Sequence, residues 1–272
     1  MAKTARVQTK KVYPSGGSTS LSIGRLLTGA WAAGALLGLA ARPAVAGAPF
    51  ITDDPGIVPY GHNELYVASQ GAHTPGNWSG DVHIEYNRGI YPNVMAHVIV
   101  SDAYNDPSGG LRATGRGDTE LGIKYQFVDQ NASIPAVAIF PLAEVPSGNE
   151  TKHLGTGHTM YFLPVWAQKD WGEGWETYGG GGYWIDNNAG GKNHWFMGWE
   201  LSKALSEQLT FGGEIFHQTD PGYGLGANSG FNVGGIYDFD SHNHLLFSAG
   251  KGVQNVDLTD QLMYYAAYEW TW

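Results

Sequence analysis

The chain contains no cysteine among its 272 residues, and only 15 % of those residues are charged. Without cysteine, a disulfide framework and a thiolate metal site are both excluded. The charged fraction is also low, since a typical soluble domain has about 25 %. After residue 46 there is no long helical period and no run of about 18 apolar residues, so no transmembrane helix is expected there. In contrast, glycine is plentiful at 40 residues, and aromatic side chains make up 13 %.

Residues 1–46 lack acidic side chains, and they are predicted to be a cleaved export signal. An apolar core, Leu26–Ala41, follows a basic start, and Ala44-Val45-Ala46 fits the small-x-small rule for cleavage before Gly47. The alternative is an uncleaved membrane anchor, but this core is shorter than the span of about 20 residues that a membrane helix needs. The basic residues that precede the core are Lys3, Arg6, Lys10, Lys11 and Arg25.

Removing this leader makes the remaining chain strongly acidic. The leader holds 6 of the 15 basic residues and none of the 25 acidic ones, which leaves a net charge of about −16. Phosphate binding needs a basic face, so nucleic acid is not expected as a partner.

Beyond Gly47 the chain alternates in character with a period of two, in runs of about ten residues separated by Gly, Asn, Asp and Pro clusters. This repetition is typical of a transmembrane antiparallel up-and-down β-barrel of about 12 strands. The runs are 62–72, 80–90, 93–103, 116–128, 134–144, 157–168, 175–186, 194–203, 208–218, 229–239, 244–253 and 259–272. The phase of 134–144 is undecided and that of 157–168 is weak, so ten or fourteen strands stay open.

The final run favours lipid most clearly. Steps of two back from Trp272 give an apolar or aromatic row, and the intervening row is more polar. Tyr264–Trp272 is similar to the signal that outer-membrane barrel assembly machinery reads. The alternative is an edge strand of a soluble sandwich.

The connections support the same topology. If the chain starts in the periplasm, the odd connections (73–79, 104–115, 145–156, 187–193, 219–228, 254–258) face outward and are mostly longer than the even ones (91–92, 129–133, 169–174, 204–207, 240–243). We therefore expect a barrel over 62–272 in the outer membrane of a Gram-negative bacterium, in contact with its lipids. Residues 47–61 are too polar and proline-rich to span, and they are expected to form a periplasmic or plug segment.

The first half of the mature chain resembles the outer-membrane family labelled as a meta-pathway of phenol degradation, often described as transporters. The matching motifs are Pro49-Phe50, Thr52-Asp53-Asp54-Pro55, Glu64-Leu65-Tyr66, Glu85-Tyr86-Asn87, Gly117–Phe127, Phe140-Pro141 and Pro146-Ser147-Gly148. The resemblance implies an outer-membrane barrel but no substrate and no catalytic residue. Position 126 is often basic in that family and is Gln here, which would remove one lumen charge.

The polar rows of the predicted strands supply the candidate lumen-lining residues. They are Glu85, His97, Glu120, Lys124, Glu200, Glu214 and Lys251, joined by Glu269 on the last strand. Such groups form either a structural network filling a narrow barrel or a polar, net-negative conduit, because buried charge must be paired or wetted.

No catalytic, nucleotide-binding or metal-binding motif stands out, so no cofactor, metal or enzymatic activity is expected. The sequence predicts a channel for passive uptake of small solutes, with aromatic or hydrophobic compounds as candidates. The alternatives are a structural barrel with a blocked lumen, and a barrel enzyme acting on lipid or lipopolysaccharide. Ser147, His153, His158 and Asp220 are the residues considered for the enzyme, although no spacing singles them out.

Overall fold

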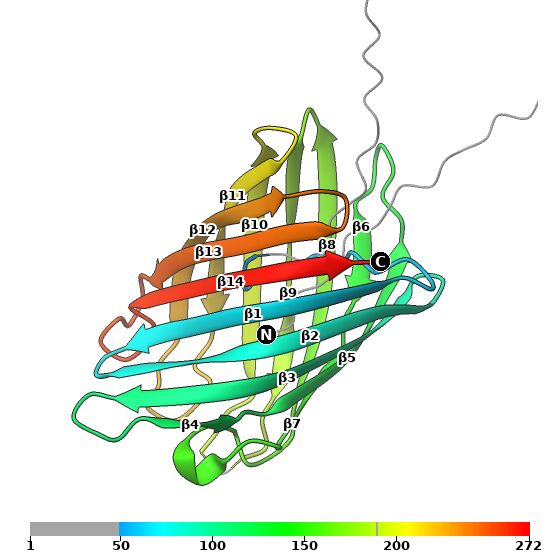
Figure 1. Ribbon diagram of the computed structural model, residues 1–272. Coiled ribbons are helices and arrows are strands. Elements are labelled where there is room, and N and C mark those ends of the chain that lie inside the picture. The colour runs from blue at the N-terminus through cyan, green and yellow to red at the C-terminus, as the bar shows by residue number, and fades with distance from the viewer. Residues whose placement is uncertain (1–48, 189) are drawn as a thin grey trace, which may run out of the picture.

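Extended segments in lipid must pair every backbone N–H and C=O, and this sheet meets that need by closing on itself. The computed structural model describes residues 49–188 and 190–272, which form an antiparallel β-barrel (Figure 1). Closure comes from the first strand, β1 (Asn63–Thr74), which pairs with β2 (Asn77–Tyr91) on one side and β14 (Leu262–Thr271) on the other. Val67 lies opposite both Ile84 and Tyr268, so the first and last strands seal the barrel.

The remaining strands follow one another around the wall, apart from two interruptions. They are β3 (Val94–Pro107), β4 (Ala113–Arg116), β5 (Thr119–Val128), β6 (Ala136–Ile139), β7 (Leu142–Val145), β8 (Met160–Gly172), β9 (Trp175–Ile185), β10 (His194–Ala204), β11 (Leu209–Gln218), β12 (Asn228–Asp238) and β13 (Asn243–Gly252). A short 3-10 helix, η1 (Glu150–Lys152), lies between β7 and β8.

Two neighbouring strands of the wall are broken in the middle. β4 and β5 both pair with β3, and β6 and β7 both pair with β5 and β8, so each pair acts as one membrane strand. The second break falls at Phe140-Pro141, where proline has no N–H to donate to a ladder. Counted this way the barrel has twelve strands, as expected.

The connections differ from the expected ones at one end of the barrel. The predicted 73–79 connection is only a two-residue turn between Thr74 and Asn77, and β3 continues to Pro107 instead of ending at 103. Polar side chains pair across these extensions, as in the bond from Asn77 Nδ2 to Asn105 Oδ1 (2.9 Å). The alternation of apolar side chains ends at the edge of the apolar band, but strand pairing continues beyond that edge. The alternation therefore predicts strands that are shorter than those observed.

Side chains alternate between an apolar exterior and a mixed interior. On β10 the outward row contains Trp195, Met197 and Trp199, each about half exposed, while Phe196 and Glu200 between them are buried. The run at 134–144 also has a defined phase, with Ala138, Phe140 and Leu142 facing inward. An apolar outer surface over a closed sheet is what lipid contact requires.

The predicted leader, 1–46, lies outside the described residues. Within the described ranges, no helix is long and apolar enough to cross a membrane.

Candidate functional site in the barrel lumen

The segment just before β1 runs through the inside of the barrel. Phe50, Thr52, Asp53, Ile57 and Val58 are all buried there. Ile57 and Val58 pack into a cluster with inward-facing side chains of β3, β7, β8, β10, β11 and β14. Residues 49–58 therefore contact walls on several sides of the lumen, and we call them the lumen segment.

Glu214 on β11 binds the start of the lumen segment through its backbone. Its carboxylate accepts the N–H groups of Ile51 (2.8 Å) and Thr52 (2.7 Å), and it also accepts Asn232 Nδ2 (2.5 Å). Ser248 on β13 donates a further hydrogen bond to the carbonyl of Pro49. These hydrogen bonds therefore hold the segment by its backbone.

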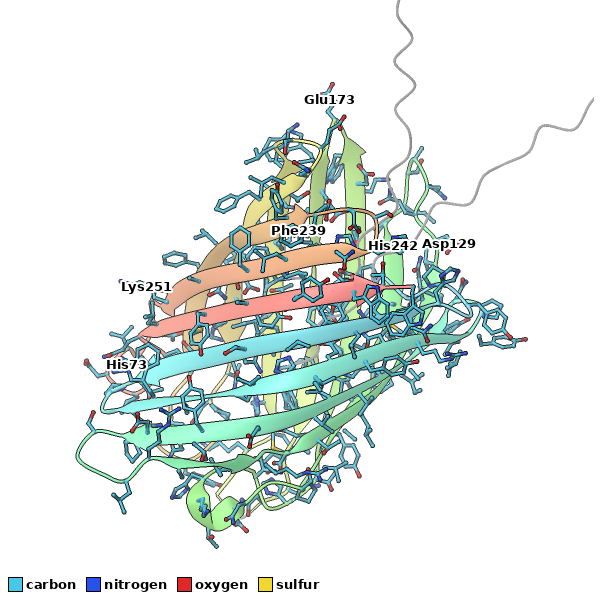
Figure 2. The ribbon with its side chains drawn as sticks, in the orientation of Figure 1. His73, Asp129, Glu173, Phe239, His242 and Lys251 are labelled. Carbon is cyan, nitrogen blue, oxygen red and sulfur yellow. The ribbon has the colours of Figure 1, made fainter. Side chains whose placement is uncertain are left out.

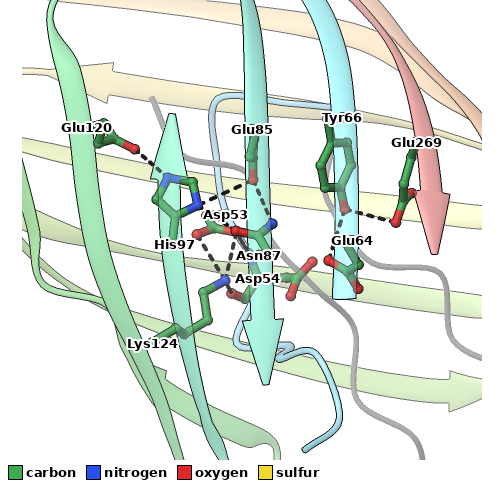
Figure 3. A network of polar contacts seen from close by, with 10 residues as sticks. All are labelled: Asp53, Asp54, Glu64, Tyr66, Glu85, Asn87, His97, Glu120, Lys124 and Glu269. Carbon is green, nitrogen blue, oxygen red and sulfur yellow. Dashed lines mark hydrogen bonds and ion pairs between the residues drawn. The ribbon is translucent and has the colours of Figure 1, made fainter. Parts of the chain in front are cut away.

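Lys124 on β5 binds the next two residues of the segment (Figure 3). Its Nζ lies 3.1 Å from Asp53 Oδ1 and 2.7 Å from the Asp54 carbonyl oxygen, and it sits 4.7 Å above the centre of the Phe140 ring. Lys124 is fully buried, so its charge is stabilised chiefly by these partners.

Burial changes the acidity of both aspartates in the segment. Burial raises the pKa of Asp54 to about 8, although nearby Lys124 pulls it down. Burial also raises the pKa of Asp53, and the positive charge of Lys124 again acts in the opposite direction. Both carboxyls therefore favour the protonated form more than exposed aspartates do.

Glutamates gather on the wall formed by β14, β1, β2, β3 and β5. Tyr66 lies opposite Glu269 on one neighbouring strand and Glu85 on the other, and its hydroxyl is 2.9 Å from Glu269 Oε1 and 3.3 Å from Glu64 Oε2 (Figure 3). Asn87 Nδ2 donates to Glu85 Oε1 at 2.8 Å.

His97 on β3 extends this polar wall toward Lys124. Its Nδ1 lies 2.7 Å from Asn87 Oδ1, and its Nε2 lies 3.0 Å from Glu120 Oε1. The ring meets the edge of Phe140 at 5.4 Å between centroids. We call the whole set the acidic arc; its members are Glu64, Tyr66, Glu85, Asn87, His97, Glu120 and Glu269.

The wall formed by β6 to β11 carries most of the buried rings. Phe162 stacks on Trp184 with centroids 4.6 Å apart, and it meets Trp166 and Phe196 edge-on. We call this set the aromatic arc; its members are Phe140, Leu142, Phe162, Trp166, Trp184, Phe196 and Phe216. It comes mainly from segments whose two rows are both apolar, so period-two reasoning could not assign it to the lumen.

A narrow recess of about 20 Å³ lies between the aromatic arc and the lumen segment. Six members of the arc line it, together with Ile51 and Asp53; the six are Phe140, Leu142, Phe162, Trp166, Trp184 and Phe196. Trp166 Nε1 is buried there without a hydrogen-bond partner. Apart from Asp53, the lining of the recess is thus apolar or aromatic.

The predicted lumen-lining residues divide clearly by position. Glu85, His97, Glu120 and Lys124 lie together in Figure 3, whereas Glu200 and Glu214 are buried opposite each other on β10 and β11. Lys251 does not join them: it is exposed, in the outward row of β13 near one end of the strand (Figure 2). A lysine can occupy a lipid-facing row at a strand end because its ammonium reaches the interface.

The enzyme candidates do not assemble into a catalytic arrangement. His158 bonds to Asp186 and to the Thr156 carbonyl, and Ser147 bonds to Thr119 and to the Gly117 carbonyl. Asp220 pairs with Lys192. Among the described residues, no group of three His, Asp or Glu side chains is arranged to hold a metal ion.

No family model and no curated protein sequence matches the chain. Among solved structures, an outer membrane channel from Pseudomonas putida F1 is similar, with a TM-score of 0.66 and 13 % identity over 79 % of this chain and 97 % of that chain. The NanC porin is also similar, with a TM-score of 0.54 and 10 % identity over 76 % of this chain and 98 % of that chain. At such identities the likeness concerns the fold, and this barrel shares its architecture with an outer membrane channel and a porin.

Proposed function

We propose that this protein is an outer-membrane channel for the passive passage of small solutes, and that apolar and aromatic molecules are its preferred class. The observation that carries the proposal is the recess beside the aromatic arc, which offers a guest mostly ring surface inside a barrel. The channel character of similar barrels and the family resemblance of residues 49–148 support the same role.

We further propose that residues 47–61 act as a removable plug, and that residues 1–46 direct export and are cleaved. The plug proposal is supported by the form of the contacts. The side-chain hydrogen bonds that hold the polar half of the segment come from Lys124, Glu214 and Ser248, so a small number of broken bonds would free that half.

Uptake of a neutral aromatic dye tests the channel role. The dye N-phenylnaphthylamine fluoresces in membranes and is held back by an intact lipopolysaccharide leaflet. Cells that make the protein should take up the dye faster than cells with an empty vector, and deleting residues 49–58 should speed uptake further. A Phe162→Ala, Trp166→Ala variant, made at equal abundance, serves to test the role of the aromatic arc and should lose part of the gain.

The second candidate is a structural barrel with a permanently blocked lumen. The dense packing of Ile57 and Val58 against the wall favours it. Under this alternative, cells with the full protein would match the empty vector, and only the deletion variant would admit dye. That outcome would contradict the channel proposal.

A further inference from the structure

The buried ionisable side chains of the lumen are mostly acidic. In the described ranges, Lys124 is the one Lys or Arg among the buried residues. Against it stand eight buried carboxyl side chains: Asp53, Asp54, Glu64, Glu85, Glu120, Glu200, Glu214 and Glu269. Lys124 is already engaged by the lumen segment, through Asp53 and the carbonyl of Asp54.

Several carboxylates are held by neutral donors. Glu214 is bound by two backbone N–H groups and the amide of Asn232, and Glu269 by the hydroxyl of Tyr66. Glu85 Oε1 accepts from the amide of Asn87 and also lies 3.5 Å from His97 Nδ1. Such bonds favour the charged form but cancel none of its charge. Since Glu85 and Glu269 lie on β2 and β14 and Glu214 lies on β11, acidic side chains line more than one side of the lumen.

Two carboxylate oxygens have no donor. Glu85 Oε2 and Glu269 Oε2 are buried without a hydrogen-bond partner, and both residues are 0 % exposed. Both side chains face inward on either side of Tyr66 (Figure 3). A desolvated carboxylate oxygen without a donor is stabilised by a cation that approaches it, and an anion at the same point is repelled.

We infer that this lumen passes cations and neutral solutes and rejects anions, and that Glu64, Glu85 and Glu269 on β1, β2 and β14 set this preference. The inference rests on the proposed channel function. In a narrow passage with low-dielectric walls, charge of one sign concentrates counter-ions and excludes co-ions. The preferred guest is therefore an uncharged or cationic ring compound, whereas aromatic carboxylates and sulfonates are excluded.

Permeation of three ring compounds of similar size tests the inference on the full barrel in liposomes. The probes are phenyltrimethylammonium, benzenesulfonate and neutral phenyl glucoside, whose charges do not change with pH. We expect the cation and the neutral compound to enter, and the anion to enter at least about 10-fold more slowly than the cation. Equal entry of all three would overturn the inference and leave the channel proposal standing. Entry of none, at the rate of empty liposomes, would overturn both.

A planar-bilayer measurement under a KCl gradient supplies a second readout. The reversal potential should give a K⁺ over Cl⁻ permeability ratio of about 10 or more. The combined Glu64→Gln, Glu85→Gln, Glu269→Gln variant should move that ratio toward one without abolishing the current, and Glu85→Gln alone serves if the triple variant does not fold. Glu207→Gln, in an exposed turn, is the matched control and should change nothing. A wild-type ratio near or below one, or an unchanged ratio in the variants, would overturn the inference.

Discussion

The two walls of the lumen stabilise the same fold by opposite means. The acidic arc buries Glu85, Glu120 and Glu269, whose side chains depend on specific donors such as Asn87, His97 and Tyr66. The aromatic arc buries rings in stacked and edge-on contact, which need no hydrogen-bond partner apart from an acceptor for each indole N–H. The difference suggests a division of labour, in which the aromatic arc supplies stability and the acidic arc supplies selectivity.

The lumen segment lies between the two walls and uses both. Asp53 is bound by Lys124 and also lines the recess with Ile51, beside the rings. Any solute in the recess would therefore touch the segment that blocks it. Changes on the two walls should thus displace the segment to different degrees.

The largest effect is expected from Lys124→Met. The change leaves Asp53 buried without its cation, and removing one partner of a buried pair costs about 3–5 kcal/mol. We expect the lumen segment to leave its place while the barrel stays folded. A cysteine at position 57, buried in the parent protein, should then react much faster with a membrane-impermeant maleimide.

Lys203→Met is the control for this change. Lys203 lies 4.9 Å from the centre of the Trp175 ring and donates to the Glu173 carbonyl, outside the lumen. Its loss should leave the reactivity of position 57 unchanged. Equal reactivity in all three proteins would show that Lys124 does not hold the segment.

Phe162→Ala is expected to lower the free energy of unfolding of the barrel by a similar amount. Phe162 contacts Trp166, Trp184 and Phe196, and truncating a buried phenylalanine costs about 3–5 kcal/mol. Urea unfolding in detergent, followed by loss of compact mobility on a gel, measures the difference. The neighbouring Leu163→Ala, which is 51 % exposed on the outer face, should cost about 1 kcal/mol or less. Comparable losses in both variants would mean that the aromatic arc is not the core.

A smaller effect is expected from Glu214→Gln. The amide keeps the size of the side chain but has one acceptor oxygen, so only one of the Ile51 and Thr52 N–H groups keeps its bond. An orphaned buried donor costs about 1–3 kcal/mol. Labelling at position 57 should rise, but less than in Lys124→Met, and Glu207→Gln should not change it. A rise larger than that of Lys124→Met would reverse the proposed order of the two anchors.

Part of the acidic arc carries a signal in the sequence, and the aromatic arc carries none. Glu85, His97 and Glu120 stand out because each is a polar side chain on one row of a strand whose other row is apolar. Phe162 and Trp166 carry no such signal, since Leu163 and Val165 on the other face are equally apolar. Alternation gives a phase only where the two faces differ in polarity.

Contacts between residues distant in the sequence could not be predicted either. The bond from Lys124 to Asp53 spans 71 positions, and the bond from Thr52 to Glu214 spans 162. Composition showed that residues 50–60 were too polar to span, but not which wall residues would bind them. The prediction that Lys251 lines the lumen is wrong, because Lys251 lies in the same outward row as Leu245 and Ala249.

The smallest effect is expected from pH, and it acts on Asp54. Its pKa is about 8 in the docked lumen segment because of burial, whereas a free, solvated aspartate titrates near 4. The docked state therefore holds a proton that the undocked state releases. Docking is most stable below about pH 4, weakens as the pH rises toward about 8, and changes no further above that. Lys124 and the Gly56 N–H both favour the ionised carboxylate, so the change should be graded.

Conductance in planar bilayers measures this shift, since release of the segment widens the lumen. We expect conductance to rise between about pH 5 and pH 8 in the parent protein. Asp54→Asn carries no titrating group at that position, so it should lose part of the rise while Asp53 keeps the remainder. Because the carboxylates of the acidic arc titrate in both proteins, only the difference between the two curves reports on Asp54. Identical curves would mean that protonation of Asp54 does not control the segment, and the anchoring would then rest on Lys124 and Glu214 alone.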